Sequence, residues 1–260
     1  MSNVYKVLPQ VYDRWQQTYG NDYSTLILPR VLSTIKTFRI PTSTMLDLAC
    51  GTGTLALLMA RRGWNVWGVD GSEGMIDEAK KKFLRCKLPV VLVHEDMRQF
   101  RLDTSVMLTT CLYDSLNHLL SRKALLDTFR AVHLHTQPSG YFVFDVNNQR
   151  CFKTLWRQTE TIKHKDFTMI LHNSYDSLVK CAQSEVTLFM KKGGMYERSS
   201  EYVRERYFTD EEIASLLRRA GFHVMQRETF NFTNNPDIGK IKTWWVAQKR
   251  AETDRVSRDS

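Results

Sequence analysis

Residues 45–56 read Met-Leu-Asp-Leu-Ala-Cys-Gly-Thr-Gly-Thr-Leu-Ala, and this stretch decides the expected fold. An apolar run with one aspartate leads into two closely spaced glycines, and a helix-like run follows. Glycines at the start of a helix allow the backbone to approach a ligand, and the helix N-terminus offers it backbone N–H groups. The stretch therefore predicts a strand, a ligand-binding turn and a helix in that order.

The same alternation of short apolar runs and helix-like stretches continues on both sides of this junction. Alternating strands and helices are typical of parallel βαβ units, in which helices cover both faces of the sheet. The chain is therefore expected to be an α/β protein. The expected strands are 45–49, 65–69, 90–94, 106–111 and 141–145, and the expected helices lie near 53–62, 73–85 and 121–135.

The pattern changes after residue 147. Residues 167–173, 184–190 and 195–207 are expected to be antiparallel strands joined by turns. A helix capped by Thr209, with Glu212 in the capping-box position, resumes the α/β pattern. Strands at 222–231 and 241–248 complete the sheet, and a helical segment at 3–38 precedes it. We expect four segments: an N-terminal helical segment with the ligand-binding core (1–150), an inserted antiparallel lid (151–207), the completion of the core (208–250) and a flexible tail (251–260).

Composition excludes several classes of protein. The 260 residues are 42% hydrophobic and 25% charged, ordinary values for a globular protein. The five cysteines are scattered without a C-x-x-C pair, so neither a disulfide framework nor a metal site is expected. No run approaches the roughly 18 apolar residues of a membrane helix, and we expect a cytoplasmic protein with no membrane partner. The net charge of +9 allows an anionic partner such as RNA, but both halves of the chain share it.

Each of the first three expected strands has an aspartate associated with it: Asp47 lies within the first, and Asp70 and Asp96 come at or after the ends of the second and third. Gly51-x-Gly53-x-x-Ala56 also satisfies a dinucleotide fingerprint, but Asp47 favours a cationic ligand over a pyrophosphate. Asp70 ends the second strand, where it can accept both hydroxyls of a ribose. Asp96 follows the third strand, where it can accept an adenine amino group. The pattern indicates an adenosine with an ammonium and a sulfonium.

The motifs D-L-A-C-G-T-G, G-V-D-G-S and E-D-M resemble those of class I S-adenosylmethionine-dependent methyltransferases, over about 40–250. The resemblance implies a Rossmann-like seven-stranded sheet of order 3-2-1-4-5-7-6 with an antiparallel last strand. It also implies S-adenosyl-L-methionine as cofactor. The cofactor contacts that we expect are Tyr19, Asp47, Ala49, Cys50, Gly51, Gly53, Asp70, Met75, Asp96, Met97 and Leu112.

The methyl acceptor is expected beside residues 110–119, Thr-Cys-Leu-Tyr-Asp-Ser-Leu-Asn-His-Leu, which leave the fourth strand at the ligand-binding edge. His118 is the expected general base, with Tyr113 as the alternative. The segment is similar to that of deoxyamino-sugar N,N-dimethyltransferases, in which a histidine at this position is implicated as the base. In the alternative, His118 only bonds a backbone group. The expected acceptor contacts are Tyr12, Asn117, Arg204 and Arg206, although the two arginines also fit solvated lid charges.

We expect methyl transfer to nitrogen or oxygen of a small molecule by a monomer or homodimer. The alternatives are an RNA methyltransferase, a non-catalytic cofactor-binding protein and a nicotinamide-dependent oxidoreductase. An RNA substrate is disfavoured because the chain lacks both an added RNA-binding module and an N-P-P-Y-type motif after the fourth strand.

Overall fold

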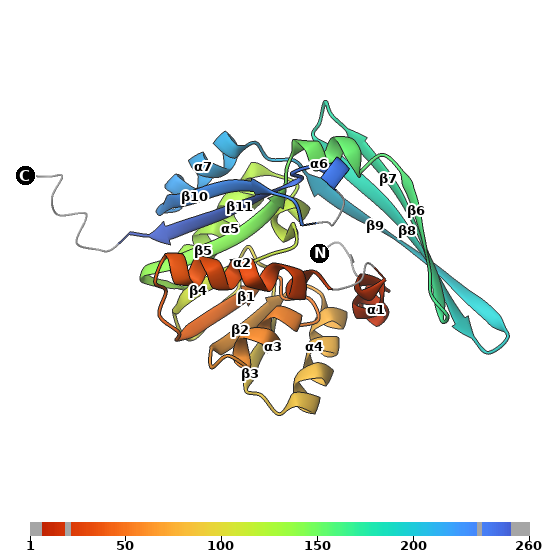
Figure 1. Ribbon diagram of the computed structural model, residues 1–260, viewed down its shortest axis with the longest axis horizontal. Coiled ribbons are helices and arrows are strands. Elements are labelled where there is room, and N and C mark those ends of the chain that lie inside the picture. The colour runs from red at the N-terminus through yellow and green to blue at the C-terminus, as the bar shows by residue number, and fades with distance from the viewer. Residues whose placement is uncertain (1–6, 19–21, 233–235, 251–260) are drawn as a thin grey trace, which may run out of the picture.

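The central sheet has seven strands in the order β10-β11-β5-β4-β1-β2-β3, as the computed structural model describes it for residues 7–18, 22–232 and 236–250 (Figure 1). The strands are β1 (Thr44–Leu48), β2 (Asn65–Asp70), β3 (Val90–His94), β4 (Val106–Cys111), β5 (Thr136–Asn147), β10 (Phe222–Phe230) and β11 (Lys242–Lys249). β11 runs antiparallel to both of its neighbours, and the other pairs are parallel. The expected fold class and strand order are confirmed.

Helices cover both faces of this sheet. The helices are α2 (Tyr23–Thr37), α3 (Thr54–Ala60) and α4 (Glu73–Cys86) on one face and α5 (Arg122–Leu134) and α7 (Asp210–Arg219) on the other. Each set encloses its own apolar core: Trp244 belongs to the first and Trp245 to the second, because successive strand residues point to opposite faces. α7 begins with the expected capping box between Thr209 and Glu212.

A second sheet of four antiparallel strands, β6-β7-β8-β9, projects from the ligand-binding end of the core (Figure 1). Its strands are β6 (Thr159–Lys163), β7 (Phe167–Asp176), β8 (Cys181–Lys192) and β9 (Met195–Arg206). We call this sheet the lid. A short helix, α6 (Gln149–Thr154), leads into it from β5. The sequence predicted neither α6 nor β6: only Ile162 of the polar β6 is buried, so the alternation is too weak to read.

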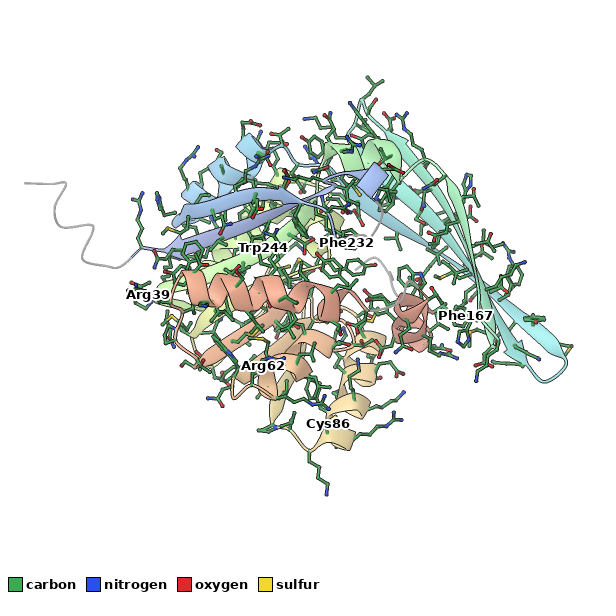
Figure 2. All side chains as sticks on the ribbon, viewed as in Figure 1. Arg39, Arg62, Cys86, Phe167, Phe232 and Trp244 are labelled. Carbon is green, nitrogen blue, oxygen red and sulfur yellow. The ribbon has the colours of Figure 1, made fainter. Side chains whose placement is uncertain are left out.

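The N-terminal segment lies between the lid and the core. It consists of a 3-10 turn, η1 (Leu8–Gln10), and the short helix α1 (Tyr12–Gln17). Leu8 and Val11 pack into the apolar inner face of the lid, and Arg14 lies over the ring of Phe167, which Figure 2 shows beside α1. On its other side, Asp13 accepts from the Thr52 hydroxyl of the glycine loop. The segment thus links the lid to the loop after β1.

Two further 3-10 turns are η2 (Ser115–His118), after β4, and η3 (Pro236–Ile238), before β11. In the described part of the chain, no helix is long and apolar enough to cross a membrane. The tail expected at 251–260 lies outside the described residues.

Candidate active site

The loop after β1 takes a left-handed path. Ala49, Gly51 and Gly53 have φ of 56°, 54° and 75°. A Cβ added to Gly53 would lie 2.8 Å from Cε2 of Phe83 on α4, so this glycine permits close packing of the loop. A Cβ added to Gly51 would meet nothing within 4 Å. The backbone at Gly51 therefore faces open space at the edge of the sheet, as a ligand-binding turn requires.

Asp47 is buried in β1 beneath this loop. Its carboxylate accepts from the Thr110 hydroxyl at 2.9 Å and from the backbone N–H of Ala56. Burial raises the pKa of Asp47 to about 7, although these two hydrogen bonds oppose the rise. A nearby cation would stabilise the ionised form, so the site suits the ammonium that the sequence predicted.

Asp70 ends β2 and reaches both the glycine loop and the start of α4. One oxygen accepts from the Gly51 N–H and the other from the Ser72 N–H, both at 2.8 Å. Burial raises its pKa despite these two donors. The carboxylate is thereby fixed at the edge of the sheet beside the open side of Gly51, and each of its oxygens has a second lone pair for a ribose hydroxyl.

The remaining predicted cofactor residues surround the same edge. Asp96, after β3, binds the guanidinium of Arg98, and this hydrogen bond lowers the pKa of its carboxyl group. The other side chains are half-buried or buried: Met97 and Ala49 pack at the rim of one apolar core, Leu112 lies in the other, and Met75 and Cys50 are buried near the loop. Their roles as cofactor contacts stay predictions, as does that of Tyr19, which lies outside the described residues.

The chain leaves β4 through two consecutive residues in left-handed conformation, Tyr113 (φ 58°) and Asp114 (φ 51°). Non-glycine residues take this conformation at a cost of about 1–2 kcal/mol each. Both backbone N–H groups donate to the carboxylate of Asp145 on β5, at 2.7 and 3.1 Å. The ring of Tyr113 stacks on that of Tyr23, with 4.5 Å between the ring centroids. These contacts fix the start of η2 and therefore the position of His118.

His118 ends η2 under the base of the lid. Its Nδ1 lies 3.2 Å from the backbone oxygen of Arg204, and because a carbonyl only accepts, Nδ1 carries the proton of the neutral ring. Nε2 is then the basic nitrogen, and it faces Oε1 of Glu205 at 4.0 Å. Burial lowers the pKa of His118, and the nearby Asp114 carboxylate opposes this only in part. The lowered pKa favours the neutral ring, whose basic nitrogen is Nε2.

Glu205 completes a cluster that the sequence did not predict. Its side chain is 3% exposed, accepts from the Asn147 amide at 2.9 Å and shares a hydrogen bond with Asp114. Burial and the charge of Asp114 raise the pKa of Glu205 well above its ordinary value. One acceptor atom each from Asp114, His118 and Glu205 lies within 4.8 Å of the other two. We call these three residues the acceptor triad.

The residues predicted to bind the methyl acceptor lie around this triad, but their side chains contact other groups of the protein. Asn117 is fully buried: its amide donates to the Arg206 carbonyl and accepts from the Asn147 N–H, so it ties the lid to β5. Arg204 and Arg206 lie on the lid face opposite Val203 and bond Gln183 and Glu212. Tyr12, on α1, meets Trp15 edge to face. Whether any of the four binds the acceptor stays a prediction.

Sequence reasoning also missed Asp145 and Lys242. Lys242 is 1% exposed and donates to both Asp114 and Asp145. A sequence signal pointed to Asp145, because it ends a predicted parallel strand as Asp70 does. Glu205 had one too, because it alternates with Val203 on the inner face of its strand. No sequence signal pointed to Lys242, because a lysine before an apolar run is usually exposed.

Comparison with known proteins identifies the kind of domain to which the glycine loop belongs. Residues 45–140 match the family model described as a methyltransferase domain. The chain is 29% identical to the putative methyltransferase YqeM of Bacillus subtilis over 208 residues, covering 79% of this chain and 83% of that one. It is 27% identical to a dTDP-3-amino-3,4,6-trideoxy-α-D-glucopyranose N,N-dimethyltransferase of Streptomyces venezuelae, over 52% of this chain and 55% of the other.

Among solved structures, a S-adenosylmethionine-dependent methyltransferase of Clostridium acetobutylicum matches with a TM-score of 0.81 and 22% identity, covering 96% of this chain and all of the other. That likeness extends the shared fold over the lid as well as the core. The matched domain contains Asp47, the glycine loop and Asp70, whose geometry fits the cofactor: open backbone at Gly51 beside a fixed carboxylate. The chain is therefore an enzyme of the S-adenosylmethionine-dependent methyltransferases.

Proposed function

We propose that this enzyme methylates the nitrogen of a small-molecule amine. The observation that carries the proposal is the acceptor triad, whose three acceptor atoms lie within 4.8 Å of one another. An ammonium has several N–H donors pointing in different directions, so it can bond more than one of these atoms at once. The convergence of the three atoms therefore suits a protonated amine.

The charge around the triad favours the same acceptor. Asp114 and Asp145 share the single ammonium of Lys242, so one cation faces two carboxylates. Glu205, whose pKa is raised by burial and by the Asp114 charge, adds no cation to the group. A negative environment attracts an ammonium, whereas it opposes the formation of an alkoxide from a hydroxyl group. Nitrogen is therefore preferred to oxygen.

In methyl transfer, the chain's own residues would remove a proton, stabilise positive charge and hold the donor. The bound cofactor supplies an activated methyl group. Nε2 of His118 would take a proton from the ammonium and leave a nitrogen that can accept the methyl group. The Asp114 carboxylate would stabilise the positive charge that returns to this nitrogen. The glycine loop, Asp47 and Asp70 hold the donor in line.

The names of several relatives support an amine acceptor, since one is an amino-sugar N,N-dimethyltransferase and another a cypemycin N-terminal methyltransferase. We further propose that the enzyme works in the cytoplasm as a monomer or homodimer. All five cysteines, each within the described residues, are free thiols, which suits a reducing compartment.

The test is transfer of a labelled methyl group from S-adenosylmethionine to matched acceptors that differ only in an amino or hydroxyl group. The panel includes amino sugars, aliphatic amines and a short peptide with a free N-terminus, each with its hydroxyl analogue, and transfer RNA. We expect label on amines only, with a rate that falls below the pKa of His118. Label on the hydroxyl analogues or on RNA alone would overturn the proposal.

A further inference from the structure

Lys242 is a buried lysine that no part of the cofactor site explains. Its side chain is 1% exposed, and its ammonium lies between the carboxylates of Asp114 and Asp145. Three aromatic rings surround the same ammonium, those of Tyr23, Tyr113 and Phe232, with centroids at 5.2, 5.5 and 5.5 Å. Figure 2 shows Phe232 between the core sheet and the lid. Burying a lysine this completely is costly unless its charge is matched.

The contacts of Lys242 all lead to the start of η2. Asp145 accepts the two backbone N–H groups of the left-handed pair Tyr113 and Asp114, and Lys242 binds that same carboxylate at 2.7 Å. Lys242 also binds the side chain of Asp114, the N-cap residue of η2. A strained pair at a functional site persists only where surrounding contacts determine it fully. These contacts come from β5 and β11.

We infer that Lys242 is a positioning residue for methyl transfer: its ammonium joins Asp114 to Asp145 and so fixes the segment that presents the acceptor triad. It touches neither the expected path of the methyl group nor the glycine loop. It acts through Asp114, whose carboxylate it keeps in place beside His118 and Glu205. The inference uses the proposed amine site, but the contacts of Lys242 stand without it.

The charges around Asp114 make this role measurable. The titratable groups that face it are Lys242 (β11), Asp145 (β5), His118 (η2), Glu205 (β9), Tyr23 (α2) and Cys151 (α6). Burial alone would raise the pKa of Asp114, but the Lys242 ammonium holds it below its ordinary value. Without that ammonium, burial and the neighbouring carboxylate of Asp145 would raise the pKa of Asp114.

The test compares Lys242→Met with Lys249→Met. Lys249 lies on the same strand and donates to the backbone oxygens of His133 and Thr136, far along the strand from the site. Both variants lose an ammonium and its hydrogen bonds, but only one loses the link to Asp114. Full-length protein with S-adenosylhomocysteine added is titrated with pH, and the ¹³C-carboxyl resonances of aspartate are followed. S-adenosylhomocysteine affinity is measured for each variant.

In Lys242→Met we expect one aspartate titration to move upward by at least two pH units, while S-adenosylhomocysteine affinity changes less than threefold. The acid limb of kcat/KM for any amine that is methylated should move upward by at least one unit, so that raising the pH restores activity in part. Lys249→Met should keep the wild-type titrations and profile. A Lys242→Met variant with unshifted aspartate titrations would overturn the inference.

Lys242→Arg keeps the charge and provides a second test if Lys242→Met fails to fold. It should keep aspartate titrations within half a pH unit of the wild type, and a shift as large as that expected for the methionine variant would contradict the role of the charge. Failure of the amine assay with the expected aspartate shift would refute the proposed acceptor and leave the role of Lys242 standing.

Discussion

Alanine at Gly53 should mainly reduce stability, whereas alanine at Gly51 should mainly reduce affinity for the cofactor. Alanine at φ of 54° or 75° costs about 1 kcal/mol relative to glycine, and both variants share this strain. At Gly53 the new methyl group would also lie 2.8 Å from the Phe83 ring and 3.2 Å from Cβ of Ala79. Overpacking of this kind costs about 1–3 kcal/mol more. We therefore expect Gly53→Ala to lose about 2–4 kcal/mol of unfolding free energy and Gly51→Ala about 1 kcal/mol.

Affinity for the cofactor should follow the reverse order. The methyl group of Gly51→Ala would enter the open space in front of the loop, where the cofactor approaches the backbone. S-adenosylhomocysteine binding should weaken at least tenfold in Gly51→Ala, and less in Gly53→Ala as long as that variant is folded. Urea unfolding and calorimetry provide the two readings. A Gly51→Ala variant that binds as tightly as the wild type would refute the position of the cofactor at this loop.

Three more variants test single residues. Asp70→Ala removes the carboxylate beside Gly51 and should weaken cofactor binding by about 1.5–3 kcal/mol in calorimetry, with an unchanged dissociation constant refuting the ribose role. His118→Ala should lower kcat about 10²-fold and leave cofactor affinity nearly unchanged, and full activity would exclude it as the base. Asp47 has a folded-state pKa of about 7 against 3.8 ordinarily, so the folded state binds the extra proton and the free energy of unfolding falls as pH rises from 4 to 7. Asp47→Asn should therefore gain up to about 4 kcal/mol of unfolding free energy at pH 8 in urea while it loses cofactor affinity, and a destabilised variant at that pH would contradict the sign.

Local patterns were enough to predict the core of this fold. The run at 45–56 joins a strand, two glycines and a helix, and each of these features is determined by neighbouring residues. The carboxylate of Asp70 could be placed because the ends of parallel strands meet at one edge of the sheet. The strand order followed from the resemblance rather than from the residues, since nothing in a single sequence states which strands pair.

The acceptor triad depends on contacts between distant residues, and local patterns do not contain them. Glu205 reaches His118 only because the lid folds back over η2, across 87 positions of the chain. Lys242 meets Asp114 across 128 positions. The polar strand β6 escaped prediction because it is an edge strand with one buried residue. Sequence analysis predicted the residues around the glycine loop as the cofactor side of the site, and the three-dimensional fold was needed to bring the acceptor triad together.

The central claim is that the edge of this sheet binds S-adenosylmethionine, and calorimetric titration tests it without knowledge of the acceptor. Wild-type protein is titrated with S-adenosylmethionine, S-adenosylhomocysteine and NADH, and the Asp70→Ala variant serves as the matched control. We predict binding of both sulfur ligands at one site per chain, weaker binding to the variant, and no binding of NADH. Binding of NADH, or equal affinity of wild type and Asp70→Ala for S-adenosylmethionine, would contradict the assignment.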